Sequence, residues 1–426
     1  MENRAALDFR DQDAYDELQA KLVPLWRSME KLNRDEQTIV VVPSAEVDFE
    51  VTASSLQAYE ERYLFLLLLL RQPRARMIYV TGQPIHPEII NYYFDLMPGV
   101  VSSHARERLF LVSPHEATPR PLAQKLLERP RLLEKIRSLI PDPDRAHLVP
   151  FMANWRDREL AMRLGVPMYG ADPKDSHLGT KSEGRRLFAA ARVAHPAGTE
   201  DLHTVDDVVA AIEALRLANP KLRRIVIKHN QGVSGFGNAV VPLDGLAPPG
   251  APAAEEEIRR RLTGLRLDGP DATVDRYYEV LAEEGGIVEE MIEGAEIRSP
   301  SVQLRITPLG EVALLSTHDQ ILGGDSGQVF IGSRFPADPE YGLALSTRAL
   351  AIGHLLAEKG VIGRFAIDFV VAREPGADWN IYAIELNLRK GGTTHPFLTL
   401  QFLTDGTYDG ATGLFNAPSG RAKYYV

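Results

Sequence analysis

Strand-like and helix-like segments alternate along the first part of this chain, and this alternation limits the fold more than any other feature. The apolar runs "TIVVVPS", "RMIYVTG", "RLFLVSP" and "AHLVPFMA" have the length and composition of buried strands. Helical segments such as "HPEIINYYFDL" and "PLAQKLLERPRLLEKIRSLI", the latter with an internal proline, separate them. Strict alternation predicts a mostly parallel sheet with helices on its faces. The first strand is not followed by G-x-G-x-x-G, so the fingerprint of dinucleotide-binding domains is absent.

The segment "ASSLQAYEERYLFLLLLLR" contains the most apolar run of the chain, Tyr63–Leu70. We expect a helix here. The run is far shorter than the roughly 20 apolar residues that a membrane-spanning helix needs, so we expect it to be buried inside the protein. The opening residues "MENRAALDFRDQDAYDEL" mix charges without an apolar stretch and predict no signal peptide.

Composition excludes several classes of function. The chain has 426 residues, which suggests two or three domains, and its net charge of −10 offers no basic excess for nucleic acid. It contains no cysteine, which excludes disulfides, thiolate zinc sites and a cysteine nucleophile. These features favour a cytoplasmic protein that binds neither nucleic acid nor a membrane.

A strand, a glycine-rich loop and a second strand are predicted over "RIVIKHNQGVSGFGNAVV". Lys228 lies near the end of the first strand, where its side chain can reach a bound phosphate. Gly232, Gly235 and Gly237 allow backbone N–H groups to approach an anion closely. The alternative is a hairpin whose glycines only permit tight turns, and the loop alone leaves both interpretations open.

Two later strands carry a set of oxygen ligands. Asp368 lies within "GRFAIDFVV", and Glu385 and Asn387 project from one face of "IYAIELNLR". The connection "AREPGADWN" contains Pro-Gly, so the two strands can form an antiparallel hairpin that brings the three side chains together. Two carboxylates and an amide oxygen suit magnesium better than zinc. The alternative is a solvated polar face, but the neighbouring residues are strongly apolar, which favours the metal site.

A third group of acidic residues occurs in "IVEEMIEGAEIR". Glu289 and Glu290 end a short strand, and Glu296 follows a glycine turn. Main-chain groups at a strand end can bind a purine edge, and a nearby carboxylate can accept from ribose hydroxyls. Taken alone, these residues are better explained as surface acids.

Five motifs in this order resemble the ATP-grasp ligases: "KSEGRRLF", "IVIKHNQGVSGFGN", "IVEEMIEGAE", "AIDF" and "IELNLR". The resemblance covers roughly residues 175 to 400, and the part before it resembles the pre-ATP-grasp domain that precedes such modules. More narrowly, "GVSGFGNA" and "ELNLRKGGTTHPFLTLQFLTDGTYD" resemble the pheganomycin-type peptide ligases. That group includes a ligase that joins glutamate to propargylglycine.

The resemblance implies an α/β chain of three parts. An N-terminal parallel-sheet pre-ATP-grasp domain would occupy residues 1–175. A two-lobed α+β ATP-grasp fold would follow, with a small lobe at 176–295 that carries the phosphate loop and a large lobe at 296–426 that carries the metal site. We expect the last third of the chain to be mainly β.

The resemblance also assigns residues to ATP and Mg²⁺. Lys181 and Lys228 match the two lysines that contact ATP phosphates, and Glu289 and Glu296 match the residues at the adenine edge and the ribose. Asp368, Glu385 and Asn387 match the magnesium ligands. Further cofactor-binding candidates come from the glycine-rich loop and from the strand that ends at the adenine, namely Gln231, Gly232, Ser234, Gly235, Gly237, Asn238, Glu290 and Ile292.

Residues for catalysis and substrate binding follow from the same resemblance. Arg389, in E-x-N-x-R, matches the residue that faces the transferred phosphate or the substrate carboxylate. Many relatives have an arginine two residues before the metal aspartate, where this chain has Ala366; Arg364, on the same strand face, is the candidate substitute. Lys228, Arg389 and Arg364 are therefore the catalytic candidates. The substrate candidates are Arg305, His318, Arg334, Arg389 and Thr394.

The implied function is an ATP-dependent carboxylate–amine ligase that joins amino acids or peptides through an acyl phosphate and releases ADP and phosphate. Glutamate and a nonproteinogenic amino acid are the substrates that the narrower resemblance suggests. Two alternatives stay open: a phosphotransferase of the same superfamily, and a non-catalytic nucleotide-binding module. A complete metal triad argues against the second. A homodimer is one option for the assembly.

Overall fold

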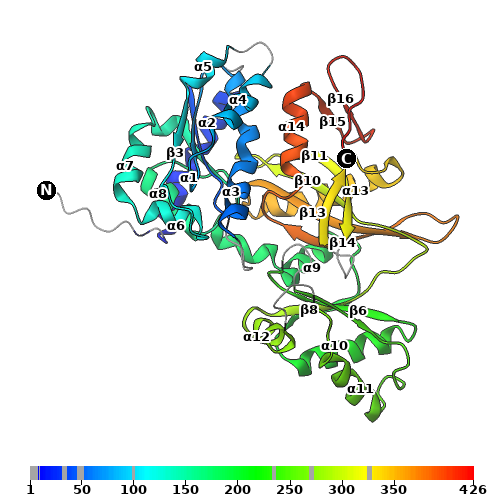
Figure 1. Cartoon of the computed structure of the whole chain (residues 1–426). Helices are drawn as coiled ribbons and strands as arrows, with labels where there is room; N and C mark the ends of the chain where they lie inside the picture. The colour runs from blue at the N-terminus through cyan, green and yellow to red at the C-terminus, as the bar shows by residue number, and fades with distance from the viewer. Residues whose placement is uncertain are drawn as a thin grey trace.

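The computed structural model describes residues 8, 10–30, 36–45, 52–97, 101–232, 237–267, 273–323 and 329–426. Three sheets organise this part of the chain (Figure 1). The first belongs to an N-terminal domain, the second to a small lobe, and the third to a large lobe that lies beside the N-terminal domain and above the small lobe in Figure 1. The strands of these sheets fall within the three predicted ranges.

The N-terminal sheet has four parallel strands in the order β3-β2-β1-β4. They are β1 (Gln37–Val42), β2 (Ala75–Val80), β3 (Leu109–Val112) and β4 (Ala146–Pro150). The predicted alternation and the parallel sheet are therefore confirmed. The helices are α1 (Gln12–Ala20), α2 (Leu22–Glu30), α3 (Ala53–Glu61), α4 (Pro87–Asp95), α5 (Ser102–Arg106), α6 (Leu122–Leu127), α7 (Pro130–Ser138) and α8 (Trp155–Leu164), with short 3₁₀ turns η2 (Pro143–Arg145) and η3 (Pro173–Gly179).

The ends of these helices follow from local sequence. The internal proline splits one predicted helix into α6 and α7, because Pro130 occupies the first turn of α7, where its missing N–H costs nothing. Asn154 and Asp157 form a capping box at the start of α8, and Gly165 ends that helix with φ of 74°.

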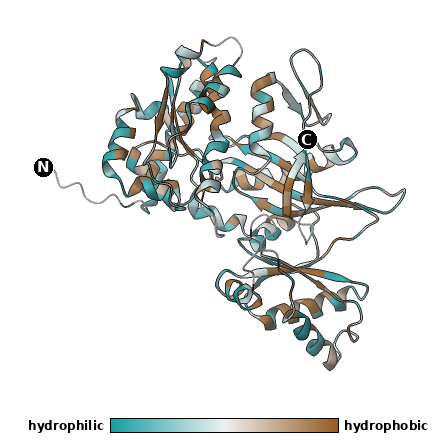
Figure 2. Cartoon of the chain, viewed as in Figure 1, coloured by the Kyte–Doolittle hydropathy of each residue, from teal (hydrophilic) through white to brown (hydrophobic). Residues whose placement is uncertain are grey.

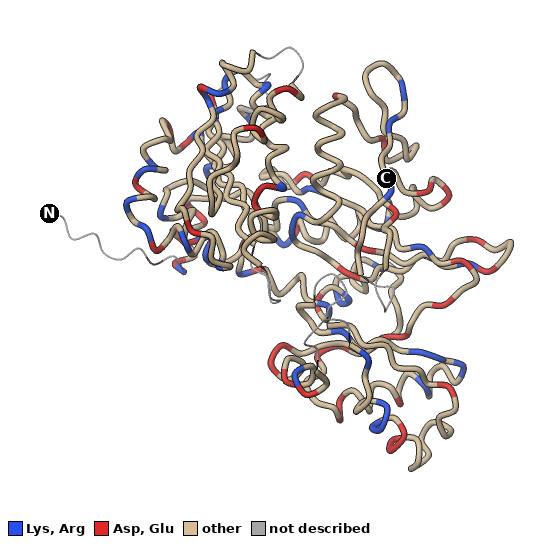
Figure 3. The backbone as a smooth tube through the Cα atoms, viewed as in Figure 1, with Lys and Arg blue, Asp and Glu red and all other residues tan. Residues whose placement is uncertain are grey.

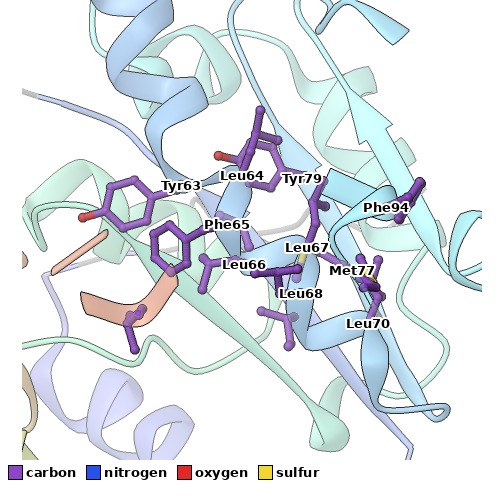
Figure 4. Packing of buried hydrophobic residues seen from close by; sticks show 14 of the residues in the cluster. Tyr63, Leu64, Phe65, Leu66, Leu67, Leu68, Leu70, Met77, Tyr79 and Phe94 are labelled. Carbon is purple, nitrogen blue, oxygen red and sulfur yellow. The ribbon is translucent and has the colours of Figure 1, made fainter. Parts of the chain in front are cut away.

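The apolar run after α3 is buried as predicted, but it is not an α-helix. Residues Arg62–Arg71 form a 3₁₀ helix, η1. Its side chains pack with Met77 and Tyr79 of β2 and with Phe94 of α4 (Figure 4). Because apolar residues occupy every side of the segment, its pattern predicts burial but does not specify the helix type.

The small lobe has an antiparallel sheet in the order β5-β8-β6-β7. Its strands are β5 (Gly198–Leu202), β6 (Arg224–His229), β7 (Asn238–Pro242) and β8 (Gly286–Glu290). The helices α10 (Val205–Ala218), α11 (Pro252–Leu262) and α12 (Val274–Glu284) lie on one side of this sheet (Figure 1). The sheet and these helices share one hydrophobic core.

The large lobe has a six-stranded sheet in the order β12-β11-β10-β13-β14, with β9 also paired to β13. The strands are β9 (Glu296–Arg298), β10 (Pro300–Ile306), β11 (Val312–Gly323), β12 (Val329–Arg334), β13 (Gly363–Arg373) and β14 (Asn380–Asn387). β13 and β14 form the predicted antiparallel hairpin. A small pair, β15 (Thr407–Asp409) and β16 (Leu414–Asn416), lies near the C-terminus.

The expectation of a mainly β last third overlooked two helices, α13 (Pro339–Glu358) and α14 (Thr394–Thr404). α13 packs against β10 and β11 through Tyr341, Leu345, Ala349, Ile352 and Leu356. These residues recur every three or four positions, so the helical signal was present in the sequence.

Two connections tie the three parts together. α9 (Lys181–Ala190) contacts β5 and β8 of the small lobe and β14 of the large lobe. Phe397 and Phe415 of the large lobe share a core with Tyr63 and Phe65 of η1. Hydrophobic residues run along the strands, and both signs of charge are interspersed over the outer helices and loops (Figures 2 and 3). Within the described ranges, no helix is long and apolar enough to cross a membrane.

Candidate active site

A cavity of about 370 Å³ lies between the sheets of the small and large lobes, and we call it the inter-lobe cavity. The small lobe contributes Lys228, Asn238 and the strand end Glu289–Ile292 to its lining. The large lobe contributes residues of β10, β11, β13 and β14, including Asp368, Glu385, Asn387 and Arg389. Residues of four of the five predicted motifs therefore meet in one space.

Lys228 lies in this cavity as half of a buried ion pair. Its Nζ contacts Oε1 of Glu289, which lies diagonally across the β6–β8 register on the same sheet face. Glu289 also accepts from Nη1 of Arg185 at 3.1 Å, and Nε of Arg185 contacts Glu200 at 2.6 Å. The carboxylate of Glu289 thus holds two cations in a buried position, where an unpaired charge would be costly.

Lys181, the first residue of α9, lies beside the inter-lobe cavity and contacts Glu385 of its lining. Its Nζ donates to Oε1 of Glu385 at 2.8 Å and to the carbonyl of Gly232 at 2.9 Å. Its backbone N–H donates to the carbonyl of Asn230 at 3.1 Å. One lysine therefore connects α9, the glycine-rich loop and the large-lobe strand β14.

The predicted metal ligands are adjacent. Asp368 pairs directly with Glu385 across the β13–β14 ladder, and Asn387 lies two residues further along β14 on the same face. Asp368 accepts from the amide of Asn387 at 3.0 Å and from the amide of Gln320 at 2.8 Å. These bonds orient the carboxylate and leave the amide oxygen of Asn387 available as a ligand.

The electrostatics of the Asp368–Glu385 pair suit a divalent cation. Burial, followed by the neighbouring charge of Glu385, raises the pKa of Asp368 to about 6. Burial acts in the same direction on Glu385, but the charge and hydrogen bond of Lys181, with Arg389 and Lys228, lower its pKa overall. Two adjacent buried carboxylates and an amide oxygen fit Mg²⁺. Among described residues no three His, Cys, Asp or Glu side chains cluster, so the amide is needed to complete the set.

A second cavity, of about 860 Å³, lies where the N-terminal domain meets the large lobe, and we call it the junction cavity. Phe330, Arg389, Gly391 and Gly392 line both cavities, so the two spaces adjoin. Gln231 of the glycine-rich loop also lines the junction cavity. Arg389 therefore lies between the group of phosphate and metal candidates and a separate, larger space.

Comparison with known proteins decides the family. The family described as "IQCH-like, ATP-grasp" matches residues 175–258 and 272–411. The chain is 32% identical over 377 residues to the L-propargylglycine–L-glutamate ligase of Streptantibioticus cattleyicolor. The aligned region covers 86% of this chain and 73% of that enzyme. This chain belongs to the ATP-grasp family.

More distant similarities accompany this ATP-grasp assignment. The IQ motif-containing protein H of Danio rerio is 24% identical over 441 residues, and the match covers 92% of this chain but 41% of that protein. Among solved structures, a biotin carboxylase–β-γ-ATP complex from Campylobacter jejuni aligns with a TM-score of 0.55 at 13% identity, over 87% of this chain and 70% of that one. The biotin carboxylase domain dimer of the Hydrogenobacter thermophilus 2-oxoglutarate carboxylase aligns with a TM-score of 0.52 at 14% identity, over 86% and 69%. These two structures support the fold alone.

Most of the ATP-grasp motif residues lie at the two cavities. Those lining the inter-lobe cavity are Lys228, Asn238, Glu289, Glu290, Ile292, Asp368, Glu385, Asn387 and Arg389. Lys181 and Gly232 contact each other beside it. Gly237 has φ of 87°, and a Cβ there would approach His229, so turn geometry already requires this glycine. Ser234 and Gly235 fall outside the described residues.

Several predicted residues lie away from both cavities. Glu296 forms an ion pair with Arg373 at 2.9 Å. His318 is fully buried in an aromatic cluster, and its Nε2 bonds to the hydroxyl of Tyr425 at 2.8 Å. Thr394 donates to Gln303, and Arg334 is exposed on β12. None of these four lines either cavity in the part of the chain that the structure describes.

Arg364 and Arg305 lie directly opposite each other across β13 and β10. Burial, followed by the charge of Arg305, lowers the pKa of Arg364 to about 10. Arg305 lies over the ring of Trp26 at 5.2 Å. Arg364 shares a sheet face with Asp368 but stands four residues away on β13, and it does not line the described surface of either cavity.

Four residues of the site were not predicted from sequence. Arg185 follows Lys181 by one helical turn in "KSEGRRLF", a signal that the i, i+4 spacing contained. Gln320 and Ser301 hydrogen-bond Asp368 from β11 and β10. Arg62 lines the junction cavity from the N-terminal domain, and nothing local in the sequence distinguishes it from other arginines.

Proposed function

We propose that this protein is an ATP-dependent carboxylate–amine ligase that forms an amide between amino acids or peptides. The observation that most directly supports this proposal is the position of Arg389 between two adjoining cavities. One cavity is lined by Lys228 and by oxygen ligands suited to a metal, with Lys181 beside it, and this set suits a nucleoside triphosphate. The other has room for organic substrates. The activity printed for the Streptantibioticus relative, a ligase of two amino acids, supports the same reaction class.

The reaction proceeds in two steps. A carboxylate oxygen of the acid attacks the γ-phosphorus of ATP, and the bond to the ADP oxygen breaks. The resulting acyl phosphate is then attacked by the neutral amine of the second substrate. The bond between the acyl carbon and the phosphate oxygen breaks, phosphate leaves, and the extra proton on nitrogen passes to solvent or phosphate. Activation is needed because a carboxylate is a poor electrophile.

The protein contributes position and charge. Lys181 and Lys228 would contact the phosphates; each already carries a carboxylate partner that fixes its side chain, and an ammonium group has three donors to share. Arg389 would stabilise charge on the transferred phosphoryl group and on the incoming carboxylate. Asp368, Glu385 and Asn387 would hold Mg²⁺, which neutralises phosphate charge when bound.

The substrates follow from the relative by analogy. We propose glutamate as the acid and a nonproteinogenic amino acid as the amine, because the relative is a ligase for glutamate and propargylglycine. We further propose that the protein acts in the cytoplasm, where ATP is available. A homodimer is the assembly that we propose, and analytical ultracentrifugation tests it.

A screen of amino acid pairs tests the function. ADP release is measured with ATP and Mg²⁺, and products are identified by mass spectrometry. We expect a dipeptide, ADP and phosphate in equal amounts, and a hydroxamate when hydroxylamine replaces the amine. AMP with pyrophosphate would refute the acyl-phosphate mechanism. ADP without an amide across a broad amine panel would instead establish the phosphotransferase.

A further inference from the structure

Among the described residues, the charged side chains that line the junction cavity are all positive, and the C-terminal residue Val426 also lies in the lining. The lining of this cavity contains two arginines, Arg62 and Arg389, and no aspartate or glutamate from any described residue. Its volume of about 860 Å³ lies within the usual range of ligand sites, roughly 300–1,000 Å³. The chain as a whole has ten more acidic than basic side chains. Two arginines without an acidic side chain among the described lining residues suit this cavity to an anionic ligand.

Arg62 lacks a protein counter-ion. The described part of the chain provides it with no ion pair and no hydrogen bond, and its guanidinium lies 4.3 Å from the ring of Tyr59. Arg71, at the other end of the same η1 helix, differs: it forms a two-pronged ion pair with Asp405 at 2.9 and 3.0 Å. The stacking on Tyr59 holds the Arg62 guanidinium in place while its hydrogen-bond donors stay available.

His395, at the start of α14, lines the same cavity beside Arg62. Its Nδ1 is buried and lacks a hydrogen-bond partner among the described residues. Burial, followed by the charge of Arg62, lowers the pKa of His395 to about 4, so the imidazole is neutral near pH 7. A neutral imidazole next to an arginine offers one further hydrogen bond without adding charge.

The two arginines come from different parts of the fold. Arg389 follows β14 and also lines the inter-lobe cavity, so a carboxylate beside it is near the phosphate and metal candidates. Arg62 belongs to the N-terminal domain and lines only the junction cavity. A ligand with two carboxylates would satisfy both cations, with one carboxylate at the reacting end and the other away from it. Tyr59, Phe151, Trp155 and Phe330 supply aromatic walls for the second substrate.

We infer that the junction cavity binds a dicarboxylic amino acid, with Arg389 at the carboxylate to be phosphorylated and Arg62, assisted by His395, at the carboxylate that does not react. Arg62 is thus a specificity-determining residue contributed by the N-terminal domain. This inference rests on the proposed ligase function and deepens it. It explains how a ligase of this kind selects an acidic amino acid over a neutral one of similar size.

The test pairs each enzyme with substrates that have or lack the second carboxylate. kcat/KM is measured for glutamate, 4-aminobutyrate and 2-aminobutyrate with the wild type and with Arg62→Gln and Arg62→Lys. In the wild type, glutamate is preferred over both monocarboxylates. Arg62→Gln lowers kcat/KM for glutamate by about tenfold to a hundredfold, as expected for a lost charge-assisted contact. For the monocarboxylate that still reacts, the same substitution leaves kcat/KM unchanged. Arg62→Lys restores part of the loss.

Controls separate this inference from the proposed function. KM for ATP should be the same in Arg62→Gln and wild type, and Arg71→Gln, which removes the paired arginine of the same helix, should keep the preference for glutamate. An equal loss for glutamate and the monocarboxylate would overturn the role of Arg62, as would a wild type that prefers a neutral amino acid as its acid. Both results leave a ligase in place. Failure of the wild type to form an amide from any acid would instead reject the ligase function.

Discussion

Lys181 of α9 and Glu385 of β14 form an ion pair of 2.8 Å in which the lysine side chain is 5% exposed and the glutamate 24%. The pair joins a phosphate candidate to a metal candidate. Lys228 and Glu289 form the equivalent pair on the small-lobe side. The two lysines proposed to contact phosphate are therefore positioned by carboxylates, one of which is itself a proposed metal ligand.

Glu385→Gln should abolish most activity. The change keeps the side-chain volume, removes one charged metal ligand and leaves Lys181 without its ion-pair partner. We expect turnover at saturating Mg²⁺ to fall by roughly a hundredfold or more. Glu340→Gln, which removes a surface carboxylate of the same lobe paired with Arg373, should be near wild type. Normal ADP release by the Glu385 variant would exclude the metal assignment.

Lys228→Met should weaken ATP binding while the fold survives, because Glu289 keeps Arg185 as a partner. Loss of one charge-assisted contact of about 1.5–3 kcal/mol corresponds to roughly a tenfold to hundredfold weaker Kd. Titration calorimetry with a non-hydrolysable ATP analogue measures this change in Kd. Lys359→Met, at an exposed position after α13, serves as the matched control. Equal affinities in both variants would mean that Lys228 is structural.

Arg185→Met should lower the stability of the small lobe, and its effect should not be confined to the reaction. Arg185 is 3% exposed and links Glu289 to Glu200, so its loss leaves buried carboxylate charge with fewer partners. We expect a loss on the order of 3 kcal/mol in the free energy of unfolding, measured in urea with a small-lobe fluorescence probe. Arg223→Met removes an exposed ion pair with Asp244 and should cost less than about 1 kcal/mol. Similar midpoints for the two variants would contradict the argument.

The sequence was sufficient to predict features that depend on short-range patterns of residues. The parallel sheet follows from alternating segments, and the neighbourhood of Asp368, Glu385 and Asn387 follows from a period of two on strands joined by a Pro-Gly turn. α13 was overlooked although its buried residues keep a helical period, because the flanking strands dominated the interpretation.

Features that depend on distant segments could not be predicted. Arg185, Lys228 and Glu289 meet only because α9 packs on a sheet whose strand order is β5-β8-β6-β7. The junction cavity combines residues of the N-terminal domain, β12, α14 and the C-terminus, so neither its volume nor its missing acids is visible in any one motif. Arg62 can be recognised as a site residue only from its position in the lining of that cavity.

Glu60 of α3 provides a test of the electrostatics in the N-terminal domain. It is 1% exposed and accepts from the backbone N–H of Gly82 at 2.5 Å. Burial raises its pKa from 4.5 to about 7, opposed in part by the Gly82 hydrogen bond and by the charge of Lys125. The folded state therefore binds this proton more tightly than the unfolded state does between pH 4.5 and 7.

The sign of the pH effect follows from this difference in proton binding. As the pH falls from about 7 to 4.5, Glu60 is protonated in the folded state but still ionised in the unfolded state, so its contribution to stability rises. Glu60→Gln removes that contribution. The free energy of unfolding of wild type minus that of Glu60→Gln, measured in urea from pH 5 to 8, should increase toward low pH and level off above about pH 7. Glu88→Gln, at an exposed position of α4, should give a flat difference. A flat profile for Glu60→Gln as well would show that the carboxyl is ionised throughout this range.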